Sequence, residues 1–362
     1  MCIIALGVSA VIMERAGTKA GKAMADRTAY GGQAVIEGVM IRGRDQVATA
    51  CRLPDGSITV RRDLVNSAMQ RNAVLRLPFF RGTPALFESL QLGYRTLMWS
   101  ADIAMEGEGQ EKPNELHYAL AILSAMVVGI GGFVLLPNFL AHLPFPAIPH
   151  AAGGNVWLQF LPSRAAVLPN ILEGVIRIVM LVGYILLIGR GAEIRRVFAY
   201  HGAEHKVVNA WEGGAELTVE GAKPYSRIHP RCGTSFLFLF FVVGILIHGL
   251  IGWQDNRLLS MATRLVLLFP VAGVSYELLR LAGRQRNSQL LKILVWPGMM
   301  LQQLTTAEPE DDQIEVAIRS MRHVLEGEGE LEPEAIETAP LGPELEAAVE
   351  APQTQVADGE SV

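Results

Sequence analysis

The chain has 362 residues, of which half are hydrophobic and only 19% are charged, and its formal net charge is −5. Its mean hydropathy is +0.29, and its apolar residues are gathered in long runs, as in membrane spans. The composition therefore excludes an ordinary soluble domain. It does not favour a nucleic-acid partner either, because the basic residues lie in the loops that flank the apolar runs.

The N-terminal part of the chain is predicted to contain a small β-rich unit. Residues 1–29 begin with an apolar stretch that is too short to span a bilayer and has no basic flank, so they are interpreted as a disordered extension. Residues 30–66 combine β-branched residues with glycines, and a Pro-Asp-Gly sequence at 54–56 predicts the turn of a hairpin. This unit is expected to lie in the cytoplasm.

Residues 67–115 are predicted to form an amphipathic helical segment followed by a linker. From Leu77 to Ala101 apolar side chains recur at helical spacing, with charged residues on the other faces. A helix of this kind is expected to lie on the membrane or against the membrane spans. The polar residues 106–115 then lead into the first span.

The region 116–306 is predicted to be a transmembrane metal-site domain with about four helices. Their approximate limits are 116–137, 167–189, 234–253 and 262–281. A further apolar stretch at 288–305 is shorter and is interrupted by Pro297 and Gly298. It is therefore interpreted as a re-entrant or interfacial segment and not as a fifth span.

Lysine and arginine residues are distributed unequally between the loops. The loop 190–233 carries seven of them and the segment from the end of the fourth span carries four, whereas the loops 138–166 and 254–261 carry one each. Because basic loops stay in the cytoplasm, we predict a multi-pass protein of the cell membrane with both termini inside. Three cysteines without a pairing framework agree with a reducing compartment.

The last segment, 307–362, contains 16 acidic and two basic residues. One helix is predicted over 314–325, and the remainder, which contains several prolines, is predicted to be a disordered cytoplasmic tail. The predicted fold is therefore a mainly α polytopic membrane protein with about four transmembrane helices, a small N-terminal β-rich unit and a disordered acidic C-terminal tail.

The sequence His201-Gly-Ala-Glu204-His205 follows closely after the second predicted span. In a helix, His201 and His205 are one turn apart on the same face, and Glu204 lies beside it. This H-x-x-E-H order is the reverse of H-E-x-x-H, in which two imidazoles bind zinc and a carboxylate acts on its water. The motif predicts a divalent metal, zinc in the first place, bound by His201 and His205, with Glu204 as the catalytic general base.

A second group of metal-capable side chains follows at His229-Pro-Arg-Cys232. His229 is the expected third ligand, and Cys232 and Glu277 compete with it for that place. Binding by both His229 and Cys232 would complete four ligands and indicate a structural metal. Arg231, in the same group, is a further candidate site residue.

Three ionisable residues in apolar surroundings are also candidates for function. Glu173 and Arg177 lie four residues apart within the second predicted span, where such a pair is expected to face the protein interior or a cavity. The alternative is an ion pair close to one membrane interface. Glu37 interrupts an apolar run, and an ion pair with Arg42 or Arg44 is the favoured interpretation.

Five stretches of the sequence carry a resemblance to a known family, and they occur in the following order: YGGQAVIEGVMIRG (30–43), FFRG (79–82), FAYHGAEHKVVNAWE (198–212), RIHPRCGTSFLF (227–238) and WPGMMLQQLTTAEPEDDQIEVAI (296–318). From about Tyr30 to about Arg319 the chain resembles the bacterial YqhQ-like family of metal-dependent membrane enzymes. The resemblance implies a polytopic membrane domain of unknown function, with an inferred metal dependence and no established substrate.

Three functions are compatible with these patterns. The favoured one is a zinc-dependent, peptidase-like membrane hydrolase. Its substrate would be a membrane-associated peptide or a lipid head group, because the motif lies close to the cytoplasmic membrane face. One alternative is a scaffold or transporter in which the His/Cys group is a structural clip. The other is an iron-dependent lipid-modifying enzyme, which is disfavoured because such enzymes have more histidine motifs.

Overall fold

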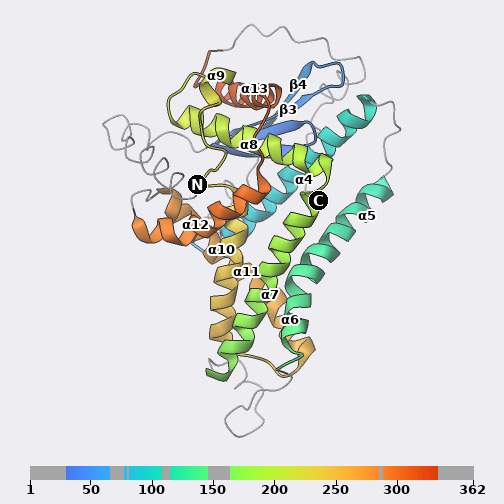
Figure 1. Ribbon diagram of the computed structural model, residues 1–362, viewed down its shortest axis with the longest axis vertical. Coiled ribbons are helices and arrows are strands. Elements are labelled where there is room, and N and C mark those ends of the chain that lie inside the picture. Colours follow the sequence, from blue (N-terminus) through green and yellow to red (C-terminus); the bar gives the residue numbers. More distant parts are fainter. Residues whose placement is uncertain are drawn as a thin grey trace, which may run out of the picture.

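The structure is a computed structural model, and it describes residues 30–65, 77–79, 81–107, 115–145, 164–284 and 288–332. Figure 1 shows a column of long helices with a sheet and its covering helices at one end. The predicted extension 1–29, most of the predicted linker and the tail beyond residue 332 lie outside the described residues.

The part at the end of the column, called the head below, consists of β1 Gly31–Val35, β2 Gly38–Arg42, β3 Gln46–Arg52, β4 Ile58–Leu64, α8 Ala192–Glu212, α9 Val219–Ala222 and α13 Asp311–Gly327. The column, called the bundle, consists of α5 Glu115–Met126, the π-helix η3 Val127–Leu135, α6 Leu136–Ala141, α7 Arg164–Ile188, α10 Gly233–Ile251 and α11 Arg257–Arg284. Two further helices lie where the head and the bundle meet, α4 Gly82–Gly107 and α12 Gln289–Thr305 (Figure 1).

The sheet of the head is a four-stranded antiparallel meander in the order β1-β2-β3-β4. The hairpin between β3 and β4 turns where the sequence predicts it: the Ser57 carbonyl accepts from the Leu53 N–H at 2.8 Å, and Gly56 has a φ of +87°. This backbone conformation is easily reached only by glycine. The predicted β-rich unit is thus confirmed.

Helices α8 and α13 pack against the sheet and against each other. Their apolar side chains form one core with those of the sheet, which includes Tyr30, Val39, Ile41, Tyr200, Val207, Ile314, Met321 and Leu325. The helix predicted at 314–325 is confirmed as α13, but it is a component of the head and not the start of a free tail. The apolar face of α13 closes the head core, although the surrounding sequence is strongly acidic.

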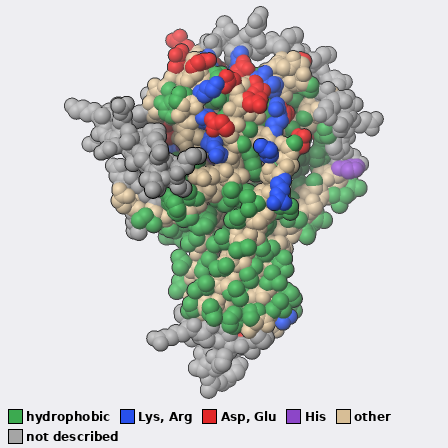
Figure 2. Space-filling model, in the orientation of Figure 1, with side chains coloured by type: hydrophobic (Ala, Val, Ile, Leu, Met, Phe, Trp, Pro, Cys, Tyr) green, Lys and Arg blue, Asp and Glu red, His purple; other side chains and the backbone are tan. Residues whose placement is uncertain are grey.

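Four helices of the described chain are long and apolar enough to span a membrane: Leu116–Ala141, Ala166–Ile188, Gly233–Ile251 and Arg257–Ala282. Their 19 to 26 residues correspond to about 28 to 39 Å of α-helix, against a hydrocarbon core of about 30 Å. Figure 2 shows hydrophobic side chains over the bundle, whereas most charged side chains gather over the head. The prediction of a mainly helical membrane protein with four spans is confirmed.

The stretch at 288–305 is not among the candidate spans of the described chain, as predicted. It differs from the prediction in one respect: Pro297 and Gly298 do not interrupt it, because both lie inside the continuous helix α12. A Cβ atom at position 298 would come within 2.8 Å of the Ser235 Cα atom, so the glycine permits close packing of α12 on α10. In Figure 1, α12 lies across the head-proximal end of the bundle.

The predicted amphipathic helix is present as α4. Its start is fixed to α11 by Arg81, which donates to the Glu277 carboxylate at 2.5 and 2.6 Å. Phe87 and Leu90 on this helix are 67% and 62% exposed. Because α4 packs on a membrane span, this exposed apolar face extends the lipid-facing surface of the bundle.

Candidate metal centre

The H-x-x-E-H motif lies in α8, which begins just after α7 ends and runs between the sheet and the bundle (Figure 1). The rings of His201 and His205 are one helical turn apart, and their centroids are separated by 4.5 Å. Glu204 is 2% exposed and His205 is 1% exposed. Glu204 and His205 are therefore buried, whereas His201 is partly exposed.

Cys232 joins the two histidines from a distant part of the sequence. It is the N-cap residue of α10, and its Sγ atom lies 3.3 Å from His201 Nε2. One ligand atom each from His201, His205 and Cys232 lies within 4.8 Å of the others. Of the candidate third ligands, the structure brings Cys232 into this group, which we call the His/Cys group.

Both imidazoles of the His/Cys group are held by backbone carbonyls. The Thr305 carbonyl lies 2.9 Å from His201 Nδ1, and the Arg227 carbonyl lies 2.6 Å from His205 Nδ1. Since a carbonyl only accepts, each Nδ1 carries the proton and each Nε2 presents a lone pair. Metal-binding histidines are oriented in this way by a partner on the second ring nitrogen.

The distance between one imidazole and the thiol of the His/Cys group fits a zinc ion. With Zn–N of about 2.0–2.1 Å and Zn–S of about 2.3 Å, ligand atoms of a tetrahedral site are separated by about 3.3–3.6 Å. The 3.3 Å between His201 Nε2 and Cys232 Sγ agrees with this range. Two imidazoles and one thiol supply three of four ligands, and Glu204 is not within 4.8 Å of all three.

Glu204 lies directly beside the His/Cys group. Its Oε2 atom is 3.4 Å from His205 Nε2. Burial raises the pKa of this carboxyl group to about 7, although the positive partial charge of His201 and the Gly32 N–H act in the opposite direction. A Cβ atom at position 32 would lie 3.2 Å from Glu204 Cγ and 2.0 Å from the Met40 carbonyl oxygen, so only glycine fits there.

His229 lies next to the His/Cys group but outside it. Its backbone N–H donates to Gln302 Oε1 at 2.9 Å, and its carbonyl accepts from Gln302 Nε2 at 2.8 Å. The ring centroid is 5.7 Å from that of His205, and Nε2 lies 3.8 Å from Glu212 Oε2. Burial lowers the pKa of His229 to about 4. The structure therefore places His229 as a neighbour of the His/Cys group.

Glu212 and Arg231 complete this neighbourhood. Arg231 donates to the Glu212 carboxylate and, at 3.1 Å, to the Tyr30 carbonyl. Burial opposes ionisation of Glu212, but His229 and Arg231 outweigh it and hold its pKa at about 2. Arg231 thus neutralises a buried carboxylate near the predicted metal site.

Two predicted candidates lie elsewhere. Glu277 is not brought into the His/Cys group, because both of its oxygens accept from Arg81. Glu37 forms an ion pair, but its partner is Arg196 of α8, whose Nη2 donates to it at 2.6 Å. The predicted partners are bound differently: Arg42 faces Glu88 at 3.9 Å, and Arg44 bonds Asp45.

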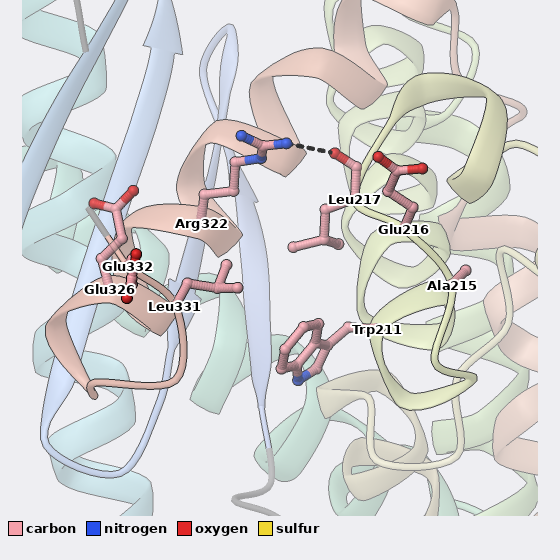
Figure 3. A pocket seen from close by; sticks show the side chains of 8 residues that line it. All are labelled: Trp211, Ala215, Glu216, Leu217, Arg322, Glu326, Leu331 and Glu332. Atoms are coloured by element: carbon pink, nitrogen blue, oxygen red, sulfur yellow. Dashed lines mark hydrogen bonds between the residues drawn. The ribbon is translucent and has the colours of Figure 1, made fainter. Parts of the chain in front are cut away.

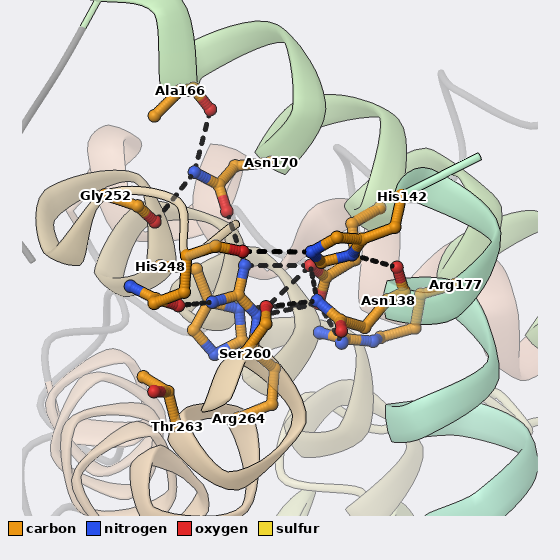
Figure 4. Close-up of polar contacts among 12 residues, drawn as sticks. Asn138, His142, Ala166, Asn170, Arg177, His248, Gly252, Ser260, Thr263 and Arg264 are labelled. Atoms are coloured by element: carbon orange, nitrogen blue, oxygen red, sulfur yellow. Dashed lines mark hydrogen bonds and ion pairs between the residues drawn. The ribbon is translucent and has the colours of Figure 1, made fainter. Parts of the chain in front are cut away.

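Glu173 and Arg177 face the interior of the bundle, as predicted for a charged pair inside a span. Arg177 Nη2 donates to Glu173 Oε1 at 2.8 Å, and both side chains are almost completely buried. Figure 4 shows Arg177 within a larger polar cluster that also contains Asn138, Asn170, His248 and Arg264, and the contacts of Glu173 place it in the same cluster. Arg264 was not predicted as a site residue, because no local pattern in the sequence shows that it lies opposite Glu173.

A cavity of about 360 Å³ opens on the head and is lined by Trp211, Ala215, Glu216, Leu217, Arg322, Glu326, Leu331 and Glu332 (Figure 3). Arg322 reaches across it and donates to the Leu217 carbonyl at 3.3 Å. None of the three His/Cys side chains lines this cavity. It therefore does not serve as the entrance to the candidate metal centre.

The fold and the site together define a polytopic membrane protein whose head holds a buried His/Cys group beside a carboxyl group. The profile of the family described as "Protein of unknown function (DUF1385)" matches residues 77–327. The "Uncharacterized protein YqhQ" of Bacillus subtilis (strain 168) is 36% identical over 309 residues, which cover 82% of this chain and 92% of that protein. The chain belongs to this family. No solved structure matches it.

Proposed function

We propose that this protein is a metal-dependent membrane hydrolase in which His201, His205 and Cys232 bind a divalent metal, zinc in the first place. The observation that carries the proposal is the convergence of three ligand atoms within 4.8 Å, with each Nδ1 fixed by a carbonyl. Three protein ligands leave one position of a tetrahedral ion open, as in catalytic zinc sites. When bound, zinc supplies Lewis acidity that lowers the pKa of water to about 7.

Glu204 is the general base of the proposed reaction. It lies beside the His/Cys group without belonging to it, and the Gly32 N–H holds its carboxyl group. Glu204 would take a proton from the attacking water as it adds to a carbonyl or phosphoryl centre.

The position of the site supports a membrane-associated substrate. Cys232 caps the first turn of the span α10, and α8 begins four residues after the span α7 ends. A site at this level is close to the membrane surface. A peptide segment at the membrane or a lipid head group therefore suits it better than a soluble metabolite.

Two competing functions keep the metal but change its role. A scaffold or transporter with a structural metal would need a fourth ligand, and the His/Cys group of the described chain supplies three. An iron-dependent lipid-modifying enzyme fits less well because a thiol ligand favours zinc over oxygen-activating iron sites built from histidine and carboxylate.

Metal content is the first test of the proposal. The purified full-length protein is expected to contain about one zinc per chain by elemental mass spectrometry, and His201→Ala is expected to lose it. His117→Ala, on the first span, is the matched control and should retain the metal. A wild-type protein that binds no divalent metal after reconstitution would contradict the proposal.

Replacement of Glu204 separates catalysis from a structural role. Glu204→Gln keeps the size of the side chain but removes the proton acceptor, which typically costs about two to four orders of magnitude in rate. We expect a folded, metal-replete protein that does not complement a deletion strain under a condition in which the deletion has a phenotype. Glu220→Gln, on the exposed surface of α9, is the control. Full complementation by metal-replete Glu204→Gln would favour the structural clip.

The side of the membrane is tested with reporter fusions. The distribution of basic residues predicts that the head is cytoplasmic. Fusions at Glu212 and at the C-terminus are expected to report the cytoplasm, and a fusion at His150 is expected to report the outside. A signal from outside at Glu212 would overturn the proposed location of the site.

A further inference from the structure

The cavity on the head lies where α8 and α13 end (Figure 3). Trp211 is in the last turn of α8, Arg322 and Glu326 are in the last two turns of α13, and the two helices pack against each other. The residues that follow these helices, 215–217 and 331–332, complete the lining. The cavity volume of about 360 Å³ corresponds to about twelve water molecules and is within the range of small-molecule sites.

Both helices end in the same backbone motif, which fixes the walls of the cavity. Gly214 follows α8 and Gly329 follows α13, and both have left-handed φ angles, of +75° and +74°. In each case the next residue donates its N–H to the carbonyl five residues back, at 2.9 Å for Ala215 and at 2.8 Å for Glu330. This is the Schellman motif. The two segments that line the cavity therefore leave their helices in defined directions.

The surroundings of the cavity are negative for two reasons. Its lining contains the carboxylates of Glu216, Glu326 and Glu332 but only one guanidinium group, that of Arg322, so three negative charges against one positive charge leave −2. In addition, the C-terminus of a helix carries a partial negative charge. The last turn of neither α8 nor α13 contains a basic residue to offset it. Side chains and helix ends therefore both favour a cation here.

Part of this charge is already neutralised within the protein. Arg62 Nη2 donates to the Glu326 carboxylate, and Arg322 donates to the Leu217 carbonyl at 3.3 Å. Glu216 and Glu332 are exposed, and among the described residues no salt bridge holds either of them. One of these two carboxylates follows α8 and the other follows α13, on opposite sides of the cavity (Figure 3). Both are accessible to a ligand.

The rest of the lining is apolar. Figure 3 shows the side chains of Leu217 and Leu331 pointing toward one another, with the ring of Trp211 beside them. Indole is the best aromatic partner of a cation, and it also packs against hydrocarbon. A hydrated inorganic cation would gain nothing from these walls. They suit an organic cation that has an apolar body.

We propose that the head binds a small organic cation in this cavity, an amine whose ammonium group contacts Glu216 and Glu332 and whose apolar body lies against Trp211, Leu217 and Leu331. A single positive charge neutralises what Arg62 and Arg322 leave of the three carboxylates. The site is independent of the His/Cys group and of the reaction proposed for it, because none of the three His/Cys side chains lines the cavity.

The test uses three probes that share a phenyl ring and differ in charge: phenethylamine, phenethyl alcohol and hydrocinnamate. A ligand that binds only the folded state raises the unfolding temperature as its concentration rises. Thermal unfolding of purified full-length protein is measured in detergent at constant ionic strength. We expect the amine to raise the unfolding temperature of the wild type, the alcohol to act more weakly and the carboxylate to have no effect. The phenyl group controls for partition into detergent or onto the bundle.

The double variant Glu216→Gln/Glu332→Gln locates the effect in the cavity. It is expected to fold, because both side chains are exposed, and to bind the amine about tenfold more weakly, since two charge-assisted contacts are lost. Glu220→Gln/Glu330→Gln makes the same charge change at exposed residues outside the lining and should bind as the wild type does.

Ala215→Leu fills the cavity without a change of charge, and it should weaken the binding of amine and alcohol alike. A wild type that does not respond to the amine would overturn the proposal. Equal affinity of the wild type for amine and alcohol would also overturn it, as would an undiminished amine response in Glu216→Gln/Glu332→Gln.

Discussion

The head and the bundle each bury a polar cluster, but the two clusters have opposite chemical character. In the head, His201 Nε2, His205 Nε2 and Cys232 Sγ converge with lone pairs facing one another. In the bundle, two guanidinium groups and an amide donate toward the single carboxylate of Glu173. The first cluster is rich in acceptors, and the second is rich in donors.

This difference decides how each cluster finds partners. Buried polar groups need partners, and a group of converging acceptors is satisfied by a cation, whereas the donors of the bundle cluster meet Glu173 and neighbouring acceptors within the protein. Burial does not account for the difference, because Glu173 and His205 are both almost completely enclosed. The charge of a ligand for the His/Cys group follows from its ring nitrogens, since each Nδ1 is already bonded to a carbonyl group.

The largest expected effect comes from removing the acceptor at the centre of the bundle cluster. Glu173→Gln leaves two buried arginines without a counter-charge, and breaking a buried ion pair in this way costs about 3–5 kcal/mol. The measurement is denaturant unfolding of the detergent-solubilised protein. The double variant Glu173→Gln/Arg177→Gln restores the net charge to +1 and should recover part of the loss. A stable single variant would show that the cluster is not charge-sensitive.

Acid is expected to destabilise the head through His229. Its pKa is about 4 in the folded protein and about 6.5 in an unfolded chain, so the folded state holds the ring neutral. As pH falls from about 6.5 to 4, the unfolded chain takes up a proton that the folded chain does not. Up to about 3 kcal/mol of stability is then lost.

Thermal unfolding followed by tryptophan fluorescence measures this pH dependence. His229→Gln lacks this titrating group, whereas Glu204, whose pKa of about 7 gives the opposite slope, titrates in both proteins. The stability difference between wild type and variant should therefore change by up to about 3 kcal/mol as pH falls from about 6.5 to 4. At lower pH Glu212 also contributes, because its pKa is about 2 in the folded protein. The stability that the ionised Glu212 carboxylate contributes is lost as pH falls from about 4.3 to 2. Parallel curves for wild type and variant between pH 6.5 and 4 would exclude a buried neutral His229.

The identity of the third metal ligand gives the next effect. Cys232→Ser is expected to weaken zinc binding by at least about 100-fold, or about 2.7 kcal/mol, because even loss of an outer partner costs 10–100-fold. His229→Ala should keep stoichiometric metal, since its ring lies outside the His/Cys group. Competition with a chromogenic chelator measures both affinities. The reverse result would return the third ligand to His229.

Local patterns in the sequence predicted much of this molecule. The four spans follow from apolar runs of suitable length, and the β3–β4 hairpin follows from its Pro-Asp-Gly turn. The pairing of His201 with His205 follows from helical geometry, since residues four apart share a face. In each case the structure depends on residues that are neighbours in the chain.

Contacts between distant segments could not be predicted in the same way. Cys232, and not His229, meets His201 because Gln302 of α12 binds the His229 backbone and Cys232 is the N-cap residue of α10. Arg264, on another helix, donates to the Glu173 carboxylate. The spacing of residues along the sequence does not indicate this contact. The acidic composition around α13 indicated a tail, although its apolar face closes the head core.

The smallest effect is expected at an exposed ion pair of the head, and it provides the reference for the buried clusters. Lys223 Nζ lies 2.7 Å from Asp311 Oδ1, and the two side chains are 58% and 61% exposed. Water and salt screen such a pair, so Lys223→Gln should change the free energy of unfolding only slightly, and the difference should shrink further at high salt. The same denaturant unfolding measures it beside Glu173→Gln. A loss as large as that of Glu173→Gln would show that this contact fixes α13 on the head, and that exposure does not separate the strong from the weak ion pairs of this protein.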